Sequence, residues 1–129
     1  MALEWLGDLR FEGAESGGPT MLLDADGVEA PGPMAALLLA AAACSGADVV
    51  SILGKMRVKL EACRIEVAGV RREIEPRRYT SVHFTFELKG AALDEAKARR
   101  AIDLSLTRYC SVVHSLAPDI AIAYELRLT

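Results

Sequence analysis

Residues 32–55, GPMAALLLAAAACSGADVVSILGK, constrain this chain more than any other stretch. Ala and Leu dominate the stretch, and both are good helix formers. Pro33 suits the first turn of a helix, and Gly54 followed by Lys55 is typical of a helix end. Asp48 is the only charged residue before Lys55. The sequence therefore predicts one long helix that is apolar on every side, and such a helix must be buried on every side.

Two environments can bury such a helix: a lipid bilayer, or a protein core that surrounds it. Residues 30–47 just reach the minimum transmembrane length of about 18 residues. They are mostly alanine, which is weakly apolar, and Asp48 would cost about 2.5–3.5 kcal/mol near the centre of a bilayer. No second apolar segment follows. We therefore expect a soluble helix that protein surrounds, and no membrane partner.

The length of 129 residues is typical of a single domain, which we place at residues 1–129. A domain of this size has few ways to surround a helix of about six turns. We therefore expect a partner subunit to supply part of the cover. The net charge of −3 argues against nucleic acid as the main partner.

The N-terminus carries acids at Glu4 and Asp8 and has no apolar segment of the kind that a signal peptide requires. The three cysteines are an odd number in a chain without a secretory signal. Both features predict reduced thiols and a cytoplasmic location.

Alternating patterns on both sides of the helix predict strands. In the N-terminal part we expect one strand at residues 3–12, interrupted or bulged near Gly7, and a second at residues 20–24, which together make a hairpin. After the helix, residues 61–74 and 79–88 predict a long antiparallel hairpin. The inward residues of its second strand are Val82, Phe84, Phe86 and Leu88.

An amphipathic helix is predicted from Leu93, and residues 110–116 continue it or start a second short helix. Residues 120–128 predict a final strand. The expected order is ββαββααβ, which is an α+β fold without repeats or linkers.

Two cysteines, Cys44 and Cys110, lie on predicted helices with an ionisable residue one turn further on. For Cys110 that residue is His114, which could help to ionise the thiol, whereas Asp48 would oppose ionisation of Cys44. Taken alone, each cysteine is most simply a structural residue. Cys63 shares a face with apolar strand residues, and we expect it in the core.

Other chemistry finds little support in the sequence. There is no CxxC motif, no zinc-ligand spacing and no phosphate-binding glycine loop, so we expect neither a metal nor a cofactor. His83 falls on the wet face of its strand. The arginine pairs at residues 71–72 and 77–78 suggest a solvated hairpin tip.

Two long segments carry a family resemblance: GPMAALLLAAAACSGADVVSIL, which holds Cys44, and LDEAKARRAIDLSLTRYCSVVHSLAPDIAIAYEL, which holds Cys110. Together and in this order they resemble the OsmC/Ohr family of hydroperoxide-handling proteins, and more narrowly its OsmC-like branch. Almost the whole chain takes part in the resemblance. It implies an intertwined homodimer in which the cysteine-bearing helices lie between sheets built from both chains.

The resemblance also implies a thiol peroxidase. Cys44 would attack an organic hydroperoxide, Cys110 would resolve the product as a disulfide, and a dithiol reductant would reduce that disulfide. Arg10 is the nearest candidate for the family's thiolate-stabilising arginine. The chain departs from the family at the glutamate of the first helical turn, where it has Met34, Ala35 and Ala36.

Two other functions stay open from the sequence. One is a non-enzymatic dimer of the same fold that binds a small apolar ligand in a pocket between subunits. The other is an inert member whose cysteines only pack the core. A peroxidase of this kind needs the two sulfurs close enough to form a disulfide, whereas neither alternative requires this proximity.

Overall fold

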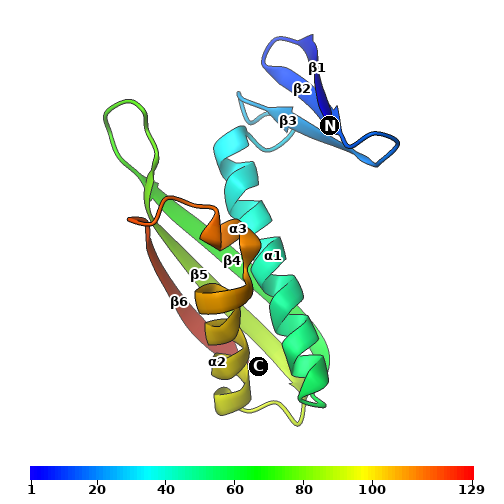
Figure 1. Cartoon of the computed structure of the whole chain (residues 1–129), viewed down its shortest axis with the longest axis vertical. Coiled ribbons are helices and arrows are strands. Elements are labelled where there is room, and N and C mark those ends of the chain that lie inside the picture. Colours follow the sequence, from blue (N-terminus) through cyan, green and yellow to red (C-terminus); the bar gives the residue numbers. More distant parts are fainter. The chain divides into compact units, whose positions relative to one another are not determined.

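The computed structural model describes all 129 residues, Met1–Thr129. Two compact units make up the chain, Met1–Leu37 and Leu38–Thr129. Each unit contains a three-stranded β-sheet, and the helices follow in the order that the sequence indicates (Figure 1). The predicted α+β class is confirmed.

The N-terminal unit is an antiparallel sheet of β1 (Ala2–Gly7), β2 (Arg10–Ala14) and β3 (Thr20–Asp24), in the order β1-β2-β3. The prediction of one strand at residues 3–12 was therefore wrong, because the chain reverses at Asp8 and Leu9, between the paired residues Gly7 and Arg10. The backbone enters this turn through Gly7 and Asp8. These residues have φ angles of 107° and 49°, a region that glycine adopts freely and aspartate tolerates. The expected irregularity near Gly7 is present as a register shift between Trp5 and Gly7.

A buried carboxylate organises the segment that follows β3. Asp24 is 3% exposed and accepts hydrogen bonds from the backbone N–H groups of Asp26, Val28 and Glu29, at 3.0, 3.3 and 3.0 Å. These bonds, that from Glu29 above all, hold the pKa of Asp24 below its ordinary value. The Asp24 side chain thus fixes the backbone at Glu29.

Helix α1 (Pro33–Lys55) has nearly the predicted bounds, with Pro33 as its first residue. One face is buried, through Ala41, Ala42, Ser45, Val49 and Leu53. The opposite face is not covered within one chain, since Leu39 is 54% and Val50 is 48% exposed. By length and composition α1 could also cross a membrane, and 33% of its apolar 18-residue window is buried. Burial on every side, as the sequence demands, is not reached by the single chain.

The second unit holds the sheet β4 (Lys59–Arg71), β5 (Tyr79–Ala91) and β6 (Ala121–Leu128), in the order β4-β5-β6. β4 pairs antiparallel and β6 parallel with β5, which is thus the central strand. The four residues predicted to face inward from β5 are each at most 1% exposed, which confirms them as core: Val82, Phe84, Phe86 and Leu88.

One face of this sheet carries helices (Figure 1). Helix α2 (Glu95–Leu104) begins at Asp94, whose side chain accepts a hydrogen bond from the N–H of Lys97 at 2.8 Å. A π-helix, η1 (Ser105–Tyr109), continues α2 directly, and α3 (Ser111–His114) follows after Cys110. The π-helix was not predicted. It lies where the chain passes the buried side of α1.

Candidate functional site

Cys44 lies in the middle of α1 and is half-buried. The helix forms here because Ala and Leu surround the cysteine, and Ala41 and Ala42 leave room for close packing. At helical spacing, Cys44 shares one stripe of α1 with Asp48, Ser51 and Lys55. This stripe lies between the buried and the exposed face, so that a solvent-borne reagent can reach the thiol.

Cys110 is fully buried at the junction of the π-helix and α3. Its N–H donates to the carbonyl oxygen of Ser105 at 2.8 Å, which is the five-residue hydrogen bond of a π-turn. Its sulfur accepts from the N–H of Val113 at 3.5 Å and lies 3.9 Å from the carbonyl oxygen of Ala41 on α1. Cys110 is therefore the N-cap of α3, and its sulfur is directed at α1.

The two thiols lie close to each other. Burial is the main cause that raises the pKa of the Cys110 thiol to about 11; the N–H of Val113 opposes this rise, and the neighbouring Cys44 thiol adds to it. Cys110 is thus a protonated thiol at neutral pH, and the more accessible Cys44 is its neighbour. The structure brings together the two cysteines that the sequence singled out.

His114 does not act on a sulfur, so the suggestion that it could help to ionise Cys110 was wrong. Its Nδ1 lies 2.9 Å from the carbonyl oxygen of Cys110, and its Nε2 lies 3.1 Å from that of Thr107. The imidazole thus bridges the π-helix and the first turn of α3. A residue four positions after a cysteine lies near it on a regular helix, but the chain leaves helical geometry at Cys110.

A polar cluster links α1 to the π-helix, and sequence reasoning missed it. Ser105 is fully buried, and its Oγ lies 3.0 Å from the Oγ of the fully buried Ser45 and 2.8 Å from Oδ2 of Asp48. Because a hydroxyl has one proton, Ser105 donates to the carboxylate and accepts from Ser45. The cluster fixes the carboxylate of Asp48 one turn beyond Cys44.

Arg10 lies on β2 in the N-terminal unit, and its side chain is paired with acidic residues of the same unit. Its guanidinium donates to Oε2 of Glu29 at 3.0 Å and lies 3.9 Å from a carboxylate oxygen of Asp8. Glu29 is held by the buried Asp24 described above. The arginine therefore has an acidic partner even though the first turn of α1 contains no acid.

Cys63, expected in the core, is exposed. It lies on β4, an edge strand that has a neighbour on one side only. Cys63 pairs with the buried Leu88 of β5, so alternation placed it on the expected face, but at this edge position its side chain is exposed. His83 is exposed, as predicted.

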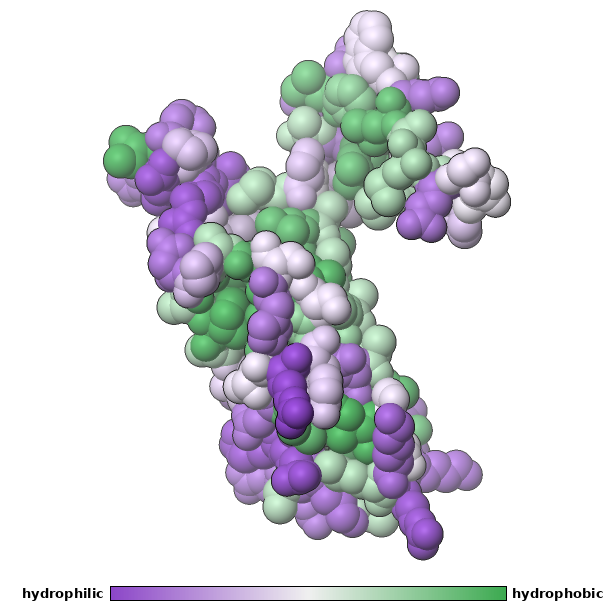
Figure 2. All heavy atoms as spheres, in the orientation of Figure 1, coloured by the Kyte–Doolittle hydropathy of each residue, from purple (hydrophilic) through white to green (hydrophobic).

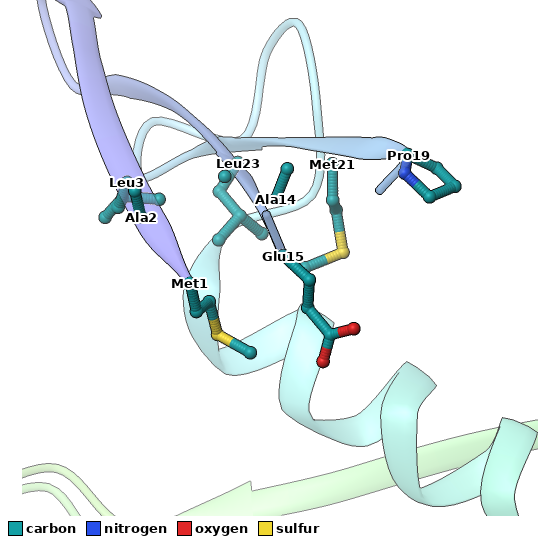
Figure 3. A pocket seen from close by; sticks show the side chains of 9 residues that line it. Met1, Ala2, Leu3, Ala14, Glu15, Pro19, Met21 and Leu23 are labelled. Atoms are coloured by element: carbon teal, nitrogen blue, oxygen red, sulfur yellow. The ribbon is translucent and has the colours of Figure 1, made fainter. Parts of the chain in front are cut away.

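An apolar pocket of about 540 Å³ lies within the N-terminal unit. Figure 3 shows that its lining comes from the three strands and the loop between β2 and β3, and the larger apolar residues are Met1, Leu3, Met21 and Leu23. Leu3 and Met21 are each 58% exposed. Figure 2 shows apolar side chains gathered on this unit. The pocket has no thiol in its lining.

Comparison with known proteins agrees with this architecture. Residues 25–125 match the sequence profile of the family described as OsmC-like protein. Protein YhfA of Escherichia coli strain K12 is 39% identical over 127 residues, which cover 96% of this chain and 95% of YhfA.

Solved structures show the same fold. A hypothetical protein from Aquifex aeolicus VF5 superimposes with a TM-score of 0.84 at 28% identity, covering 99% of this chain and 95% of that one. The organic hydroperoxide resistance protein OhrB of Bacillus subtilis superimposes with a TM-score of 0.64 at 15% identity, covering 98% and 96%. From the profile, the identity to YhfA and the shared fold, this chain belongs to the OsmC-like protein family.

Proposed function

We propose that the protein is a cytoplasmic, homodimeric thiol peroxidase that reduces organic hydroperoxides. The observation that carries this proposal is the proximity of the half-buried Cys44 to the buried Cys110, whose sulfur lies 3.9 Å from the carbonyl oxygen of Ala41 on α1 and whose pKa the Cys44 thiol helps to raise. The family includes proteins described as organic hydroperoxide resistance proteins, OhrB among them, which supports the substrate class.

The surroundings of the two thiols suit different roles. The half-buried Cys44 attacks the peroxide as a thiolate, takes one oxygen and becomes a sulfenic acid, while the alcohol leaves. Cys110, buried and protonated, then bonds to the sulfur of Cys44 as water leaves. A dithiol reductant then restores both thiols: its first thiolate bonds to one sulfur of the disulfide as the other cysteine leaves, and its second thiolate displaces the remaining cysteine by closing the reductant's own disulfide. The protected position of Cys110 suits the second thiol, because a resolving cysteine must not react before the first.

Arg10 is our candidate for stabilising the Cys44 thiolate, because a nearby cation favours the charged form of a thiol. Its ion pair with Glu29 orients the guanidinium and shares its charge. Glu29 is our candidate for the acidic partner of Arg10 that the first turn of α1 does not supply.

The incomplete burial of α1 supports the proposed homodimer. Its exposed face contains large apolar side chains at Leu37, Leu39 and Val50, together with small residues that permit close approach of another helix. The N-terminal sheet adds Leu3, Trp5 and Met21, each at least 58% exposed. A second copy of the chain that covers these faces would complete the burial that the sequence of α1 demands.

A second candidate function is the binding of a small apolar ligand without catalysis. The apolar pocket of the N-terminal unit favours it, since Met1, Leu3, Met21 and Leu23 offer the flexible, apolar lining that such ligands prefer (Figure 3). A binding protein of this kind would keep its affinity in Cys44→Ser.

The deciding experiment is a thiol titration under anaerobic conditions after adding about one equivalent of cumene hydroperoxide. We expect wild type to lose two thiols rapidly, Cys110→Ser to accumulate a sulfenic acid, and Cys44→Ser to react no faster than free cysteine. Cys63→Ser is the matched control, because that thiol is exposed and distant from the pair in sequence, and we expect it to behave as wild type. If the wild-type protein loses thiols no faster than free cysteine, the peroxidase function is excluded and the ligand-binding function becomes the leading candidate.

A further inference from the structure

Ser105, the first residue of the π-helix, makes hydrogen bonds through both its side chain and its backbone. Its side chain is fully buried and meets α1, with Oγ 2.8 Å from Oδ2 of Asp48 and 3.0 Å from the Oγ of Ser45. Its backbone carbonyl accepts the N–H of Cys110 at 2.8 Å. One residue therefore connects the backbone of the buried cysteine to α1.

A second contact joins the same segment to α1. The sulfur of Cys110 lies 3.9 Å from the carbonyl oxygen of Ala41, which precedes Ser45 by one helical turn. Positions 41, 44, 45 and 48 follow the spacing of one helix face, and Cys44 is one of them. The two contacts therefore hold the segment against the face of α1 that carries Cys44, one on either side of it.

The hydrogen bond from Ser105 to Asp48 can fix a position along α1 that apolar packing cannot. Burial of apolar surface has no preferred direction, whereas a hydrogen bond weakens steeply when its angle changes. A bond to an ionised acceptor is also stronger than one between neutral groups. Because the rest of this helix face is built from small apolar residues, the Ser105–Asp48 bond is the contact that sets the register of the segment on α1.

We propose that Ser105 is a positioning residue for disulfide formation, and that its bond to Asp48 holds the sulfur of Cys110 beside Cys44. This inference rests on the peroxidase function proposed above, whose second step is that disulfide. In this step the sulfur of Cys110 bonds to the sulfenic sulfur of Cys44, and the thiol proton leaves with the hydroxyl group as water. Holding one thiol near the other raises its effective concentration, which favours both the rate and the extent of the step.

The first test measures the equilibrium between the Cys44–Cys110 disulfide and dithiothreitol. The full chain carries Cys63→Ser, so that only the pair can form a disulfide within the chain, and alkylation followed by mass spectrometry counts the reduced and oxidised forms. We expect Ser105→Ala to lower the equilibrium constant for disulfide formation roughly ten-fold, because the pair is no longer held in place. An unchanged constant would overturn the proposal.

Two substitutions of Asp48 separate the hydrogen bond from the charge. Asp48→Asn and Asp48→Ala both remove the negative charge, but only asparagine keeps an oxygen that can accept the proton of the Ser105 hydroxyl. We expect Asp48→Ala to lower the equilibrium constant as far as Ser105→Ala does, and Asp48→Asn to retain most of the wild-type value. Asp48 is half-buried, so both variants should fold. Equal losses in the two variants would mean that the charge acts and not the bond, and would overturn the proposal.

A double-mutant cycle tests whether Ser105 and Asp48 act as one link. If their bond is the cause, Ser105→Ala should change the equilibrium constant little in a protein that already carries Asp48→Ala. Thr107→Ala is the matched control, because it removes a hydroxyl from the same π-helix whose bond, 2.6 Å to the carbonyl oxygen of Asp103, does not reach α1. We expect this control to keep the wild-type constant. Additive losses in the cycle, or an equal loss in Thr107→Ala, would assign the effect to general stability and overturn the proposal.

Rate measurements with cumene hydroperoxide distinguish this proposal from the peroxidase function. In Ser105→Ala we expect Cys44 to form a sulfenic acid at the wild-type rate, and the disulfide to form roughly ten-fold more slowly. The dithiothreitol equilibrium needs no hydroperoxide, so the loss expected there would support the positioning role even if wild type reacted no faster than free cysteine. A rapid reaction in which Ser105→Ala slows neither step would retain the peroxidase and overturn the positioning role.

Discussion

The imidazole of His114 contacts Cys110 through the backbone carbonyl, 2.9 Å from Nδ1, whereas the sulfur of Cys110 is directed at Ala41 and Val113. Its Nε2 meets the carbonyl oxygen of Thr107 at 3.1 Å. One side chain thereby ties the π-helix to α3 and holds the backbone of Cys110 between them.

Replacing His114 should therefore slow the second chemical step and not the first. In His114→Phe both carbonyl contacts are lost, and we expect disulfide formation to slow by up to roughly ten-fold, the equivalent of one or two hydrogen bonds. The rate at which Cys44 forms a sulfenic acid should stay at the wild-type value. His114→Gln retains one donor group and should restore part of the rate. Stopped-flow measurement of both steps checks this, and equal slowing of both would contradict it.

The buried Cys110 predicts a loss of stability in alkaline solution. Its folded pKa of about 11 lies above the ordinary value of 9.0, chiefly because the thiol is buried. A group whose pKa is raised on folding contributes its full stabilisation below the unfolded pKa, and this is lost as pH rises through the folded pKa. The melting temperature of the reduced protein should thus fall between about pH 9 and pH 11, and the fall should be smaller in Cys110→Ala. Parallel curves for the two proteins would contradict the assignment.

The ion pair of Arg10 with Glu29 predicts opposite effects of its two members on thiol reactivity. Arg10→Met removes the cation, and we expect peroxide attack by Cys44 to slow by roughly ten-fold or more. Glu29→Gln leaves the guanidinium charge unshared and should speed the attack a few-fold. The stability of either variant should stay within about 1 kcal/mol of wild type, because the pair is largely exposed. A slower reaction in Glu29→Gln would mean that orientation of Arg10 matters more than its charge.

The exposed face of α1 predicts that single charges will dissociate the dimer. Leu39→Glu and Val50→Lys place a charge on an apolar face that must desolvate on association, and we expect monomers at micromolar concentration by analytical ultracentrifugation. Ile74→Glu is the matched control, an exposed apolar residue at a polar hairpin tip, and it should leave the dimer intact. A wild-type protein that sediments as a monomer would exclude the homodimer outright.

Much of the fold could be predicted because its signals are local. The apolar run predicted the first and last residues of α1 almost correctly, and strict alternation identified the face of β5 that packs in the core. The division of residues 3–12 into β1 and β2 was missed because the turn at Asp8 and Leu9 lacks the asparagine–glycine or aspartate–glycine pair typical of tight hairpins.

Within the candidate site, only the residues covered by the family resemblance could be predicted from the sequence. Cys44 and Cys110 were paired by resemblance, and the structure places them near each other. The link from Ser105 to Asp48 spans 57 positions of the chain and rests on a serine that looks ordinary in a helix. The same holds for Glu29, whose bond to Arg10 joins a loop and a strand. Contacts between distant segments leave no periodic pattern in a single sequence.

The π-helix at Ser105–Tyr109 has a consequence for how this chain can change. A π-turn holds one residue more than the α-turn it replaces, and each residue of an α-helix turns the chain by about 100°. Deleting Thr107 would therefore let the segment relax into an ordinary α-helix that delivers Cys110 to nearly the same place. A deletion within α2 has no extra residue to absorb it, and it would turn every later residue by about 100°. The π-helix is thus a point where this chain can lose a residue and still keep its thiol pair.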